Sequence, residues 1–230
     1  MNKETPNTPP QPPTAKKRAW SKYVIGALLV AIIGSYGLDA FKINAAKNTA
    51  PQTASALEPG DLVYGSGQAP VKIVEYSSFT CPHCKRFHEE VVPKLLAGPV
   101  KEGRADLVFR PFPLDQRAFV TSLAVRCLPD DDAKKTAITK VFAEQGRLLV
   151  PQISGQEVLD WVGQGLTDVQ KQQMTTCVTA KETSEQVVAA MKAGKERYTI
   201  PGTPTIVVGK QVFPGEASIE EIEKALQENH

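Results

Sequence analysis

Two cysteines separated by two residues, Cys81 and Cys84, are the part of this sequence best equipped to do chemistry. They enclose Pro82 and His83, directly after an apolar stretch and directly before residues with helical spacing. A cysteine in the first turn of a helix faces unpaired backbone N–H groups and the positive end of the helix dipole. Both stabilise a thiolate, so we expect the pKa of the Cys81 thiol to be lowered.

The two enclosed residues fit the same interpretation. Pro82 would occupy the first helical position, where a missing backbone N–H costs nothing. His83 can add positive charge or a hydrogen bond near the sulfur. A more stable thiolate is a better leaving group and favours the reduced form, which makes the disulfide a stronger oxidant. The pattern therefore predicts thiol–disulfide exchange at Cys81 and Cys84.

Other uses of this spacing fit less well. A zinc site needs a second pair of ligands, but Cys127 and Cys177 lie fifty residues apart. A c-type haem site needs histidine after the second cysteine, where this chain has Lys85. A purely structural disulfide remains an alternative, although two cysteines three positions apart on a helix constrain little.

The surrounding elements alternate between strand and helix. Residues 71–76 are β-branched and apolar, which predicts a strand ending just before the cysteines. Apolar residues at 87, 91 and 95 predict a helix after them, with a kink at Pro93. Residues 107–110 predict a second strand.

Residues 116–198 show no strand-like alternation and predict four or five helices, two of them with capping-box spacing at Ser154 and Thr167. Strand texture returns at residues 205–208, and a turn at 209–210 leads into a hairpin partner at 211–213. A last helix begins at Ser218. The order indicates an α/β domain with a helical insertion.

The N-terminus predicts a location. Residues 1–22 are polar, with five prolines between positions 6 and 13, and should form a disordered tail. Residues 23–38 carry no charge, and with flanking aromatics the segment 23–41 approaches membrane-spanning length. A cleaved signal peptide is the alternative. The basic cluster before the segment would keep residues 1–22 in the cytoplasm, with 42–60 as a linker and 61–230 as the exported domain.

The net charge is +2, and apart from that cluster the basic residues are scattered, so we expect no nucleic-acid partner. Four cysteines, an even number, fit disulfide chemistry outside the cytosol.

The residues Phe79-Thr80-Cys81-Pro82-His83-Cys84 follow a strand, and a helical block separates them from Gly202-Thr203-Pro204-Thr205. In this order the motifs resemble the DsbA-like branch of the thioredoxin superfamily, over about residues 60–230. The resemblance implies a thioredoxin-like fold with an inserted helical subdomain. It also implies a cis bond before Pro204, which would leave the backbone of Thr203 free to hold a substrate strand beside Cys81.

The resemblance assigns Glu75 as a buried proton acceptor for the second cysteine, whereas an edge-exposed strand glutamate is the alternative. It also pairs Cys127 with Cys177 as a structural disulfide. Two separate buried thiols are the alternative, and an oxidising compartment favours the disulfide.

The implied function is a thiol:disulfide oxidoreductase without metal or prosthetic group, acting on cysteine-containing secreted or periplasmic proteins. A membrane-bound, quinone-coupled reoxidase would restore its disulfide, and residues 23–41 would anchor it to a bacterial inner membrane with the catalytic domain in the periplasm. After signal cleavage it would instead be soluble in the periplasm. We favour an oxidase. Thr203, where such oxidases commonly have valine, leaves an isomerase or reductase open, and a tethered chaperone-like module is a further alternative.

Overall fold

A computed structural model of the chain describes residues 57–229. The predictions for the tail at 1–22, the segment 23–41 and most of the linker at 42–60 lie outside these residues. Between residues 57 and 229, no helix is both long and apolar enough to cross a membrane.

The described chain is built on a five-stranded sheet in the order β1-β3-β2-β4-β5. β2 and β3 run parallel, and every other neighbouring pair is antiparallel. All seven residues of β2 are buried, as expected for a strand with a neighbour on each side. The strands are β1 (Leu62–Tyr64), β2 (Val71–Ser77), β3 (Ala105–Pro111), β4 (Thr205–Val208) and β5 (Gln211–Pro214).

Four of these strands occupy the places that the sequence pattern predicts, and β4 and β5 form the expected hairpin. Gly209 in its turn has φ +59°, a conformation that glycine adopts without steric cost. The sequence analysis missed β1, which pairs with β3 at the edge of the sheet. Its three residues are too few to show an alternating pattern.

The segment that follows Cys81 is not one regular helix. It divides into α2 (Pro82–Arg86), a π-helical turn η1 (Phe87–Val91), α3 (Val92–Leu95) and a second π-helical turn η2 (Leu96–Val100). The irregularity expected at Pro93 is thus a π turn immediately before it, in which the N–H of Val92 bonds to the carbonyl of Phe87.

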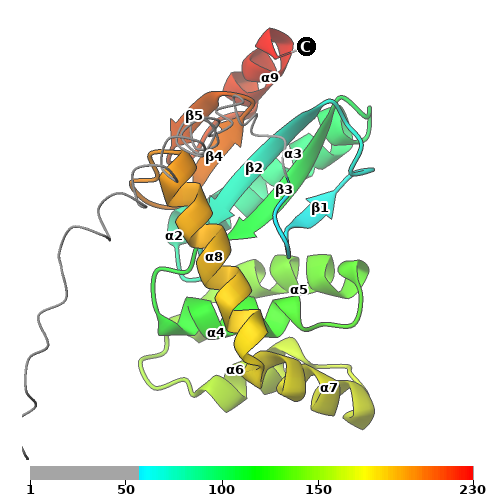
Figure 1. The fold of residues 1–230 in the computed structure, drawn as a ribbon, viewed down its shortest axis with the longest axis vertical. Helices are drawn as coiled ribbons and strands as arrows, with labels where there is room; N and C mark the ends of the chain where they lie inside the picture. Colours follow the sequence, from blue (N-terminus) through cyan, green and yellow to red (C-terminus); the bar gives the residue numbers. More distant parts are fainter. Residues whose placement is uncertain (1–56, 230) are drawn as a thin grey trace, which may run out of the picture. The chain divides into compact units, whose positions relative to one another are not determined.

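The helical insertion contains five α-helices and lies beyond one end of the sheet, and α8 runs from it back across the strands (Figure 1). The capping boxes predicted at Ser154, Thr167 and Ser218 are all present. The helices are α4 (Gln116–Arg126), α5 (Asp131–Ala143), α6 (Gly155–Val162), α7 (Asp168–Thr179) and α8 (Lys181–Arg197), with a 3-10 turn η3 (Gln145–Leu149), and α9 (Ile219–Glu228) follows the hairpin.

The insertion shares one apolar core with the thioredoxin-like part. Phe79, Phe109 and Phe142 pack ring against ring, with centroids 5.2–6.3 Å apart, and join the loop before Cys81 to β3 and α5. A smaller core around Tyr76 lies under α8, where a side chain at Gly194 would place its Cβ 2.5 Å from the Tyr76 ring. The insertion is therefore packed firmly against the sheet.

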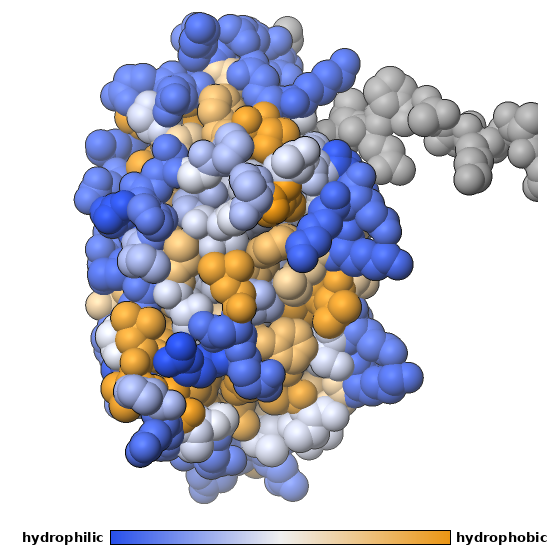
Figure 2. Space-filling model, turned by 90° about the vertical axis from the view of Figure 1, so that its left-hand side faces the viewer, coloured by the Kyte–Doolittle hydropathy of each residue, from blue (hydrophilic) through white to orange (hydrophobic). Residues whose placement is uncertain are grey.

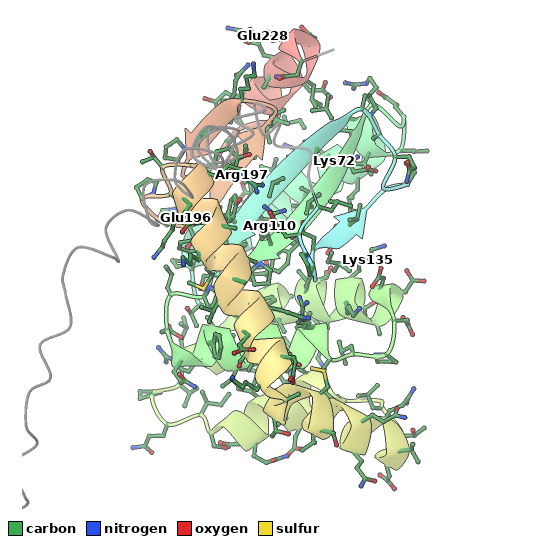
Figure 3. The ribbon with its side chains drawn as sticks, in the orientation of Figure 1. Lys72, Arg110, Lys135, Glu196, Arg197 and Glu228 are labelled. Carbon is green, nitrogen blue, oxygen red and sulfur yellow. A yellow bond between two sulfur atoms is a disulfide. The ribbon has the colours of Figure 1, made fainter. Side chains whose placement is uncertain are left out.

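Two buried ion pairs involve the inner strands β2 and β3. Arg110 of β3, beneath α8 in Figure 3, donates from Nε to Asp61 Oδ1 at 2.7 Å, and both side chains are at most 3% exposed. Lys72 of β2 lies 2.8 Å from Asp106 of β3. Asp61 thereby attaches the first described residues to the sheet.

A disulfide joins Cys127 at the end of α4 to Cys177 in α7, with Cα atoms 5.7 Å apart. It links two helices of the insertion across 50 residues of sequence.

Candidate active site

Cys81 is the N-cap residue of α2 and has an extended backbone, with φ −85° and ψ 122°. β2 and the loop after it deliver this residue to the start of the helix, and Pro82 occupies the first helical turn as expected. Cys81 is 6% exposed, and its Sγ donates to the carbonyl of Thr203, 3.1 Å away. The reactive candidate thus lies just beneath the surface beside the loop that precedes β4.

The surroundings of Cys81 favour its thiolate. The pKa of its thiol is lowered to about 5, mainly by a hydrogen bond from the Cys84 side chain. Burial opposes this shift, while Thr203 and the backbone N–H groups of His83 and Cys84 support it. At neutral pH the thiolate would therefore outnumber the thiol by about a hundredfold.

Cys84 has the opposite environment. It is completely buried on α2, and the N–H of Ser78 points to its Sγ at 3.4 Å. Burial strongly raises the pKa of this thiol, and the neighbouring Cys81 and Glu75 raise it further. Both cysteines are free thiols here. One member of the pair is prepared to react as a thiolate, and the other is held as a protonated thiol.

The bond between Thr203 and Pro204 is cis, as the resemblance implied. The Thr203 hydroxyl is buried without a regular hydrogen bond, yet it is close enough to help lower the pKa of Cys81. Thr203 and Cys81 lie 122 positions apart in the sequence. The loop before β4 thus supplies the second wall of the site.

Glu75 lies on the central strand β2 and has no exposed surface. The alternative of an edge-exposed glutamate is therefore wrong, because β3 and β4 flank β2 on both sides. Its carboxylate is near enough to Cys84 to act on the pKa of that thiol.

The His83 side chain does not act on the sulfur in the way the sequence suggested. Its Nδ1 lies 2.5 Å from the carboxylate of Glu216, in the loop between β5 and α9. Arg86 also binds this carboxylate, with Nη2 2.6 Å from Oε1. The contribution of His83 to the lowered pKa of Cys81 comes from its backbone N–H.

Two further residues touch the site that sequence reasoning did not identify. Gln145 donates its side-chain amide to the carbonyls of Phe79 and Cys81, at 2.9 and 2.8 Å. His88 places Nε2 3.0 Å from Glu75. His88 could have been found, because it shares the helical face of Cys84, Val92 and Leu95. Gln145 gave no local signal.

The molecular surface seen from the left-hand side of Figure 1 carries several separate apolar patches between charged residues (Figure 2).

Among residues 57–229, no group of three or more histidine, cysteine or acidic side chains could hold a metal ion.

Comparison with known proteins agrees with the fold and the motif. A model of the thioredoxin family matches residues 57–228, so the chain belongs to the thioredoxin family. Within that family its relatives and structural neighbours include DsbA-type proteins, which confirms the resemblance drawn from the two motifs.

Two curated relatives illustrate the similarity. A putative protein-disulfide oxidoreductase of Rickettsia felis is 26% identical over 176 residues, which cover 75% of this chain and 62% of that protein. Disulfide bond formation protein D of Bacillus subtilis is 25% identical over 177 residues, which cover 73% of this chain and 76% of that protein. The chain spans about three fifths of the length of the Rickettsia relatives it matches.

Two solved structures share the fold. BdbD of Bacillus subtilis in its oxidised form has a TM-score of 0.65 and 22% identity, over 74% of this chain and 93% of that chain. Wolbachia pipientis alpha-DsbA1 has a TM-score of 0.62 and 20% identity, over 75% of this chain and 94% of that chain. The predicted thioredoxin-like fold with a helical insertion is confirmed.

Proposed function

We propose that this protein is a thiol:disulfide oxidoreductase that exchanges a Cys81–Cys84 disulfide with cysteines of extracytoplasmic proteins, acting chiefly as an oxidase. The observation that carries the proposal is the contrast within the pair: the pKa of Cys81 is lowered to about 5, while that of Cys84 is strongly raised. A thiolate just beneath the surface, next to a fully buried thiol, is an arrangement suited to disulfide exchange.

The reaction starts from the oxidised pair. A substrate thiolate attacks Cys81 Sγ, the substrate–Cys81 bond forms, and the Cys81–Cys84 bond breaks. Cys84 leaves as a thiolate and takes up a proton. A second substrate thiolate then attacks the substrate sulfur of the mixed disulfide, and Cys81 leaves as a thiolate. The substrate loses two electrons, and the cysteine pair gains them.

The walls of the site are proposed to hold the substrate during this exchange. Thr203 and Pro204 border Cys81, and the Thr203 carbonyl that now accepts from Cys81 Sγ could instead accept from a substrate backbone N–H. Once Cys81 is a thiolate it has no hydrogen to donate, so this carbonyl needs another partner.

The direction of electron flow follows from the same thiolate. A stable Cys81 thiolate favours the reduced pair, so the disulfide tends to oxidise its partner. The Thr203 hydroxyl favours the thiolate further. Threonine at this position also occurs in isomerases and reductases of the same fold, which keeps that second function as the alternative.

The partners and location proposed here rest on the resemblance and on the sequence of the N-terminal segment. Secreted or periplasmic proteins with cysteines would be the substrates, and a membrane-bound, quinone-coupled reoxidase would accept the electrons. Residues 23–41 would anchor the chain in the bacterial inner membrane, with residues 61–230 in the periplasm. A cleaved signal would leave the domain soluble in that compartment.

Thiol trapping in cells tests the direction. Acid quenching followed by alkylation should find Cys81 and Cys84 mainly as a disulfide if the protein is an oxidase. A mainly dithiol state would overturn that assignment in favour of the isomerase or reductase. Cys81→Ser should abolish all disulfide exchange with a reduced, unfolded substrate protein. A chaperone-like module would instead keep its action on unfolded chains in this variant, because that action needs no thiol.

A further inference from the structure

A buried histidine contacts the acid beneath the active site. His88 lies on the π turn η1, and its side chain is only 5% exposed. Its Nε2 lies 3.0 Å from Oε2 of Glu75. An ionised carboxylate has no hydrogen to donate, so an ionised Glu75 requires a proton on His88 Nε2.

Aromatic rings fix the orientation of the histidine. Phe142 of α5 stacks on the imidazole, with centroids 4.4 Å apart and planes 23° apart. Phe109 of β3 meets it edge to face at 5.7 Å. The two phenylalanine rings therefore hold the His88 imidazole with Nε2 next to Glu75. One of these rings, Phe142, belongs to a helix of the insertion.

The second oxygen of Glu75 remains free. Oε1 is buried and has no hydrogen-bond partner among the described residues. A buried carboxylate oxygen without a partner is costly, which makes it a strong proton acceptor for any donor that reaches it. Cys84 is close enough for Glu75 to influence its thiol.

Few other titratable groups face this pair. Tyr64 of β1 is near enough for Glu75 to help raise its pKa, and its hydroxyl has no partner within the described chain. Lys135 of α5, labelled in Figure 3, lies above the Tyr64 ring at 5.5 Å rather than on the carboxylate. Lys85 of α2 donates from Nζ to the carbonyl of Phe142 rather than to the Glu75 carboxylate. Among the described residues, His88 is the hydrogen-bond partner of the Glu75 carboxylate.

We propose that His88 is a positioning residue for disulfide exchange: by donating to Oε2 of Glu75 it fixes the orientation of this carboxylate and leaves Oε1 to take the proton of Cys84. The inference deepens the proposed function and rests on it. When Cys84 resolves a mixed disulfide, its proton passes to Glu75, and its sulfur bonds to Cys81 Sγ. The bond from Cys81 to the foreign sulfur breaks, and that sulfur leaves as a thiolate.

The test separates the two chemical steps with oxidised glutathione as the probe. Reduced protein first attacks glutathione disulfide through Cys81, giving a mixed disulfide and one glutathione thiolate. In the second step, called ring closure below, Cys84 attacks Cys81 Sγ, forms the Cys81–Cys84 disulfide and releases the second glutathione thiolate. Acid quenching and mass spectrometry follow both species in time, across pH. The first step reports the proposed function, and the second step reports the inference.

Two substitutions at position 88 separate the hydrogen bond to Glu75 from the stacking of the ring. His88→Phe keeps an aromatic ring for stacking but has no donor, whereas His88→Gln keeps an N–H at a similar reach. Loss of a hydrogen bond to a charged group should slow ring closure by about ten- to hundredfold in His88→Phe. The rate of the first step should not change.

The outcomes are distinguishable. His88→Gln should close the ring within a few fold of the unsubstituted protein, and Tyr64→Phe, which removes the other polar group near Glu75, should leave ring closure unchanged. A normal rate of ring closure in His88→Phe would overturn the inference, as would equal slowing in both substitutions. Absence of the first step would instead overturn the proposed function.

A measurement on the unsubstituted protein covers the case in which His88→Phe does not fold. Nitrogen NMR of the histidine-labelled protein reads which ring nitrogen carries hydrogen. A proton on Nε2 of His88 is expected at neutral pH. A bare Nε2 facing Glu75 would overturn the inference, because such a ring could not donate to the carboxylate.

Discussion

Gln145 of the helical insertion donates a hydrogen bond from its side-chain amide to the main-chain carbonyl of Cys81, 2.8 Å away. The same nitrogen also reaches the carbonyl of Phe79 at 2.9 Å, and the glutamine is 3% exposed. The insertion therefore takes part in shaping the loop that carries the reactive cysteine.

Replacing this glutamine should loosen the loop. Gln145→Leu leaves two carbonyls without their donor in a buried place, which should reduce the free energy of unfolding by about 1–3 kcal/mol. Urea unfolding measures the loss, and Gln173→Leu on the exposed face of α7 is the matched control. Equal stability of the two variants would show that the contact contributes nothing.

The thiolate of Cys81 predicts a specific pH profile. With its pKa lowered to about 5, alkylation of Cys81 by iodoacetamide should be nearly independent of pH from 7 to 9 and fall with a midpoint near 5. Because this folded-state pKa is depressed, the thiolate's stabilising contribution grows as pH rises from about 5 to 9 and is lost as pH falls through 5. A midpoint near 8.5 would contradict the site as described.

Cys84 is the main cause of that lowered pKa. Cys84→Ala removes the hydrogen bond to the Cys81 thiolate, so the midpoint of alkylation should move toward that of an ordinary thiol. Cys84→Ser retains a donor and should show a smaller shift. The ultraviolet absorbance of the thiolate during a pH titration gives both midpoints. An identical midpoint in Cys84→Ala and the original protein would remove Cys84 as the cause.

The pair of Asp61 and Arg110 should matter more for folding than the exposed ion pairs. Removing one partner of a buried pair leaves an uncompensated charge, so Asp61→Asn should lower the free energy of unfolding by about 3–5 kcal/mol. Asp131, 63% exposed beside Lys134, provides the control, since Asp131→Asn should change it by less than about 1 kcal/mol. Denaturant unfolding of both variants provides the comparison, and similar losses would contradict the difference in burial.

The disulfide between Cys127 and Cys177 should stabilise the fold without serving the chemistry. Replacing both by alanine removes a crosslink that spans 50 residues, which loop-closure reasoning values at about 4 kcal/mol. Unfolding measurements should show the loss, while the first exchange step with glutathione disulfide should keep its rate. Mass spectrometry that found Cys127 open to alkylation in non-reduced protein would contradict the bond.

Local patterns in the sequence predicted the parts of this structure that local forces determine. The cysteine pair at the end of a strand, the capping boxes at Ser154 and Thr167, and the hairpin turn each depend on neighbouring residues. Their chemistry could be interpreted before any tertiary contact was known, including the low pKa of Cys81.

Contacts between distant segments could not be predicted in this way. Gln145 meets Cys81 across 64 positions, and no motif marks it. His83 seemed to point at the sulfur, but Glu216, 133 positions away, binds its ring instead. His88 and Glu75 meet because β2 lies against η1, and the packing of Phe142 from the insertion completes that contact. These arrangements depend on the folded core.

The order of the four cysteines along the chain has a consequence for assembly. Each proposed or observed pair joins a cysteine to the next one in sequence: Cys81 with Cys84, and Cys127 with Cys177. If residues 61–230 are translocated into an oxidising compartment in sequence order, these thiols arrive in that same succession. Oxidation on arrival would give the native set directly, so newly made protein would need no shuffling of mispaired bridges.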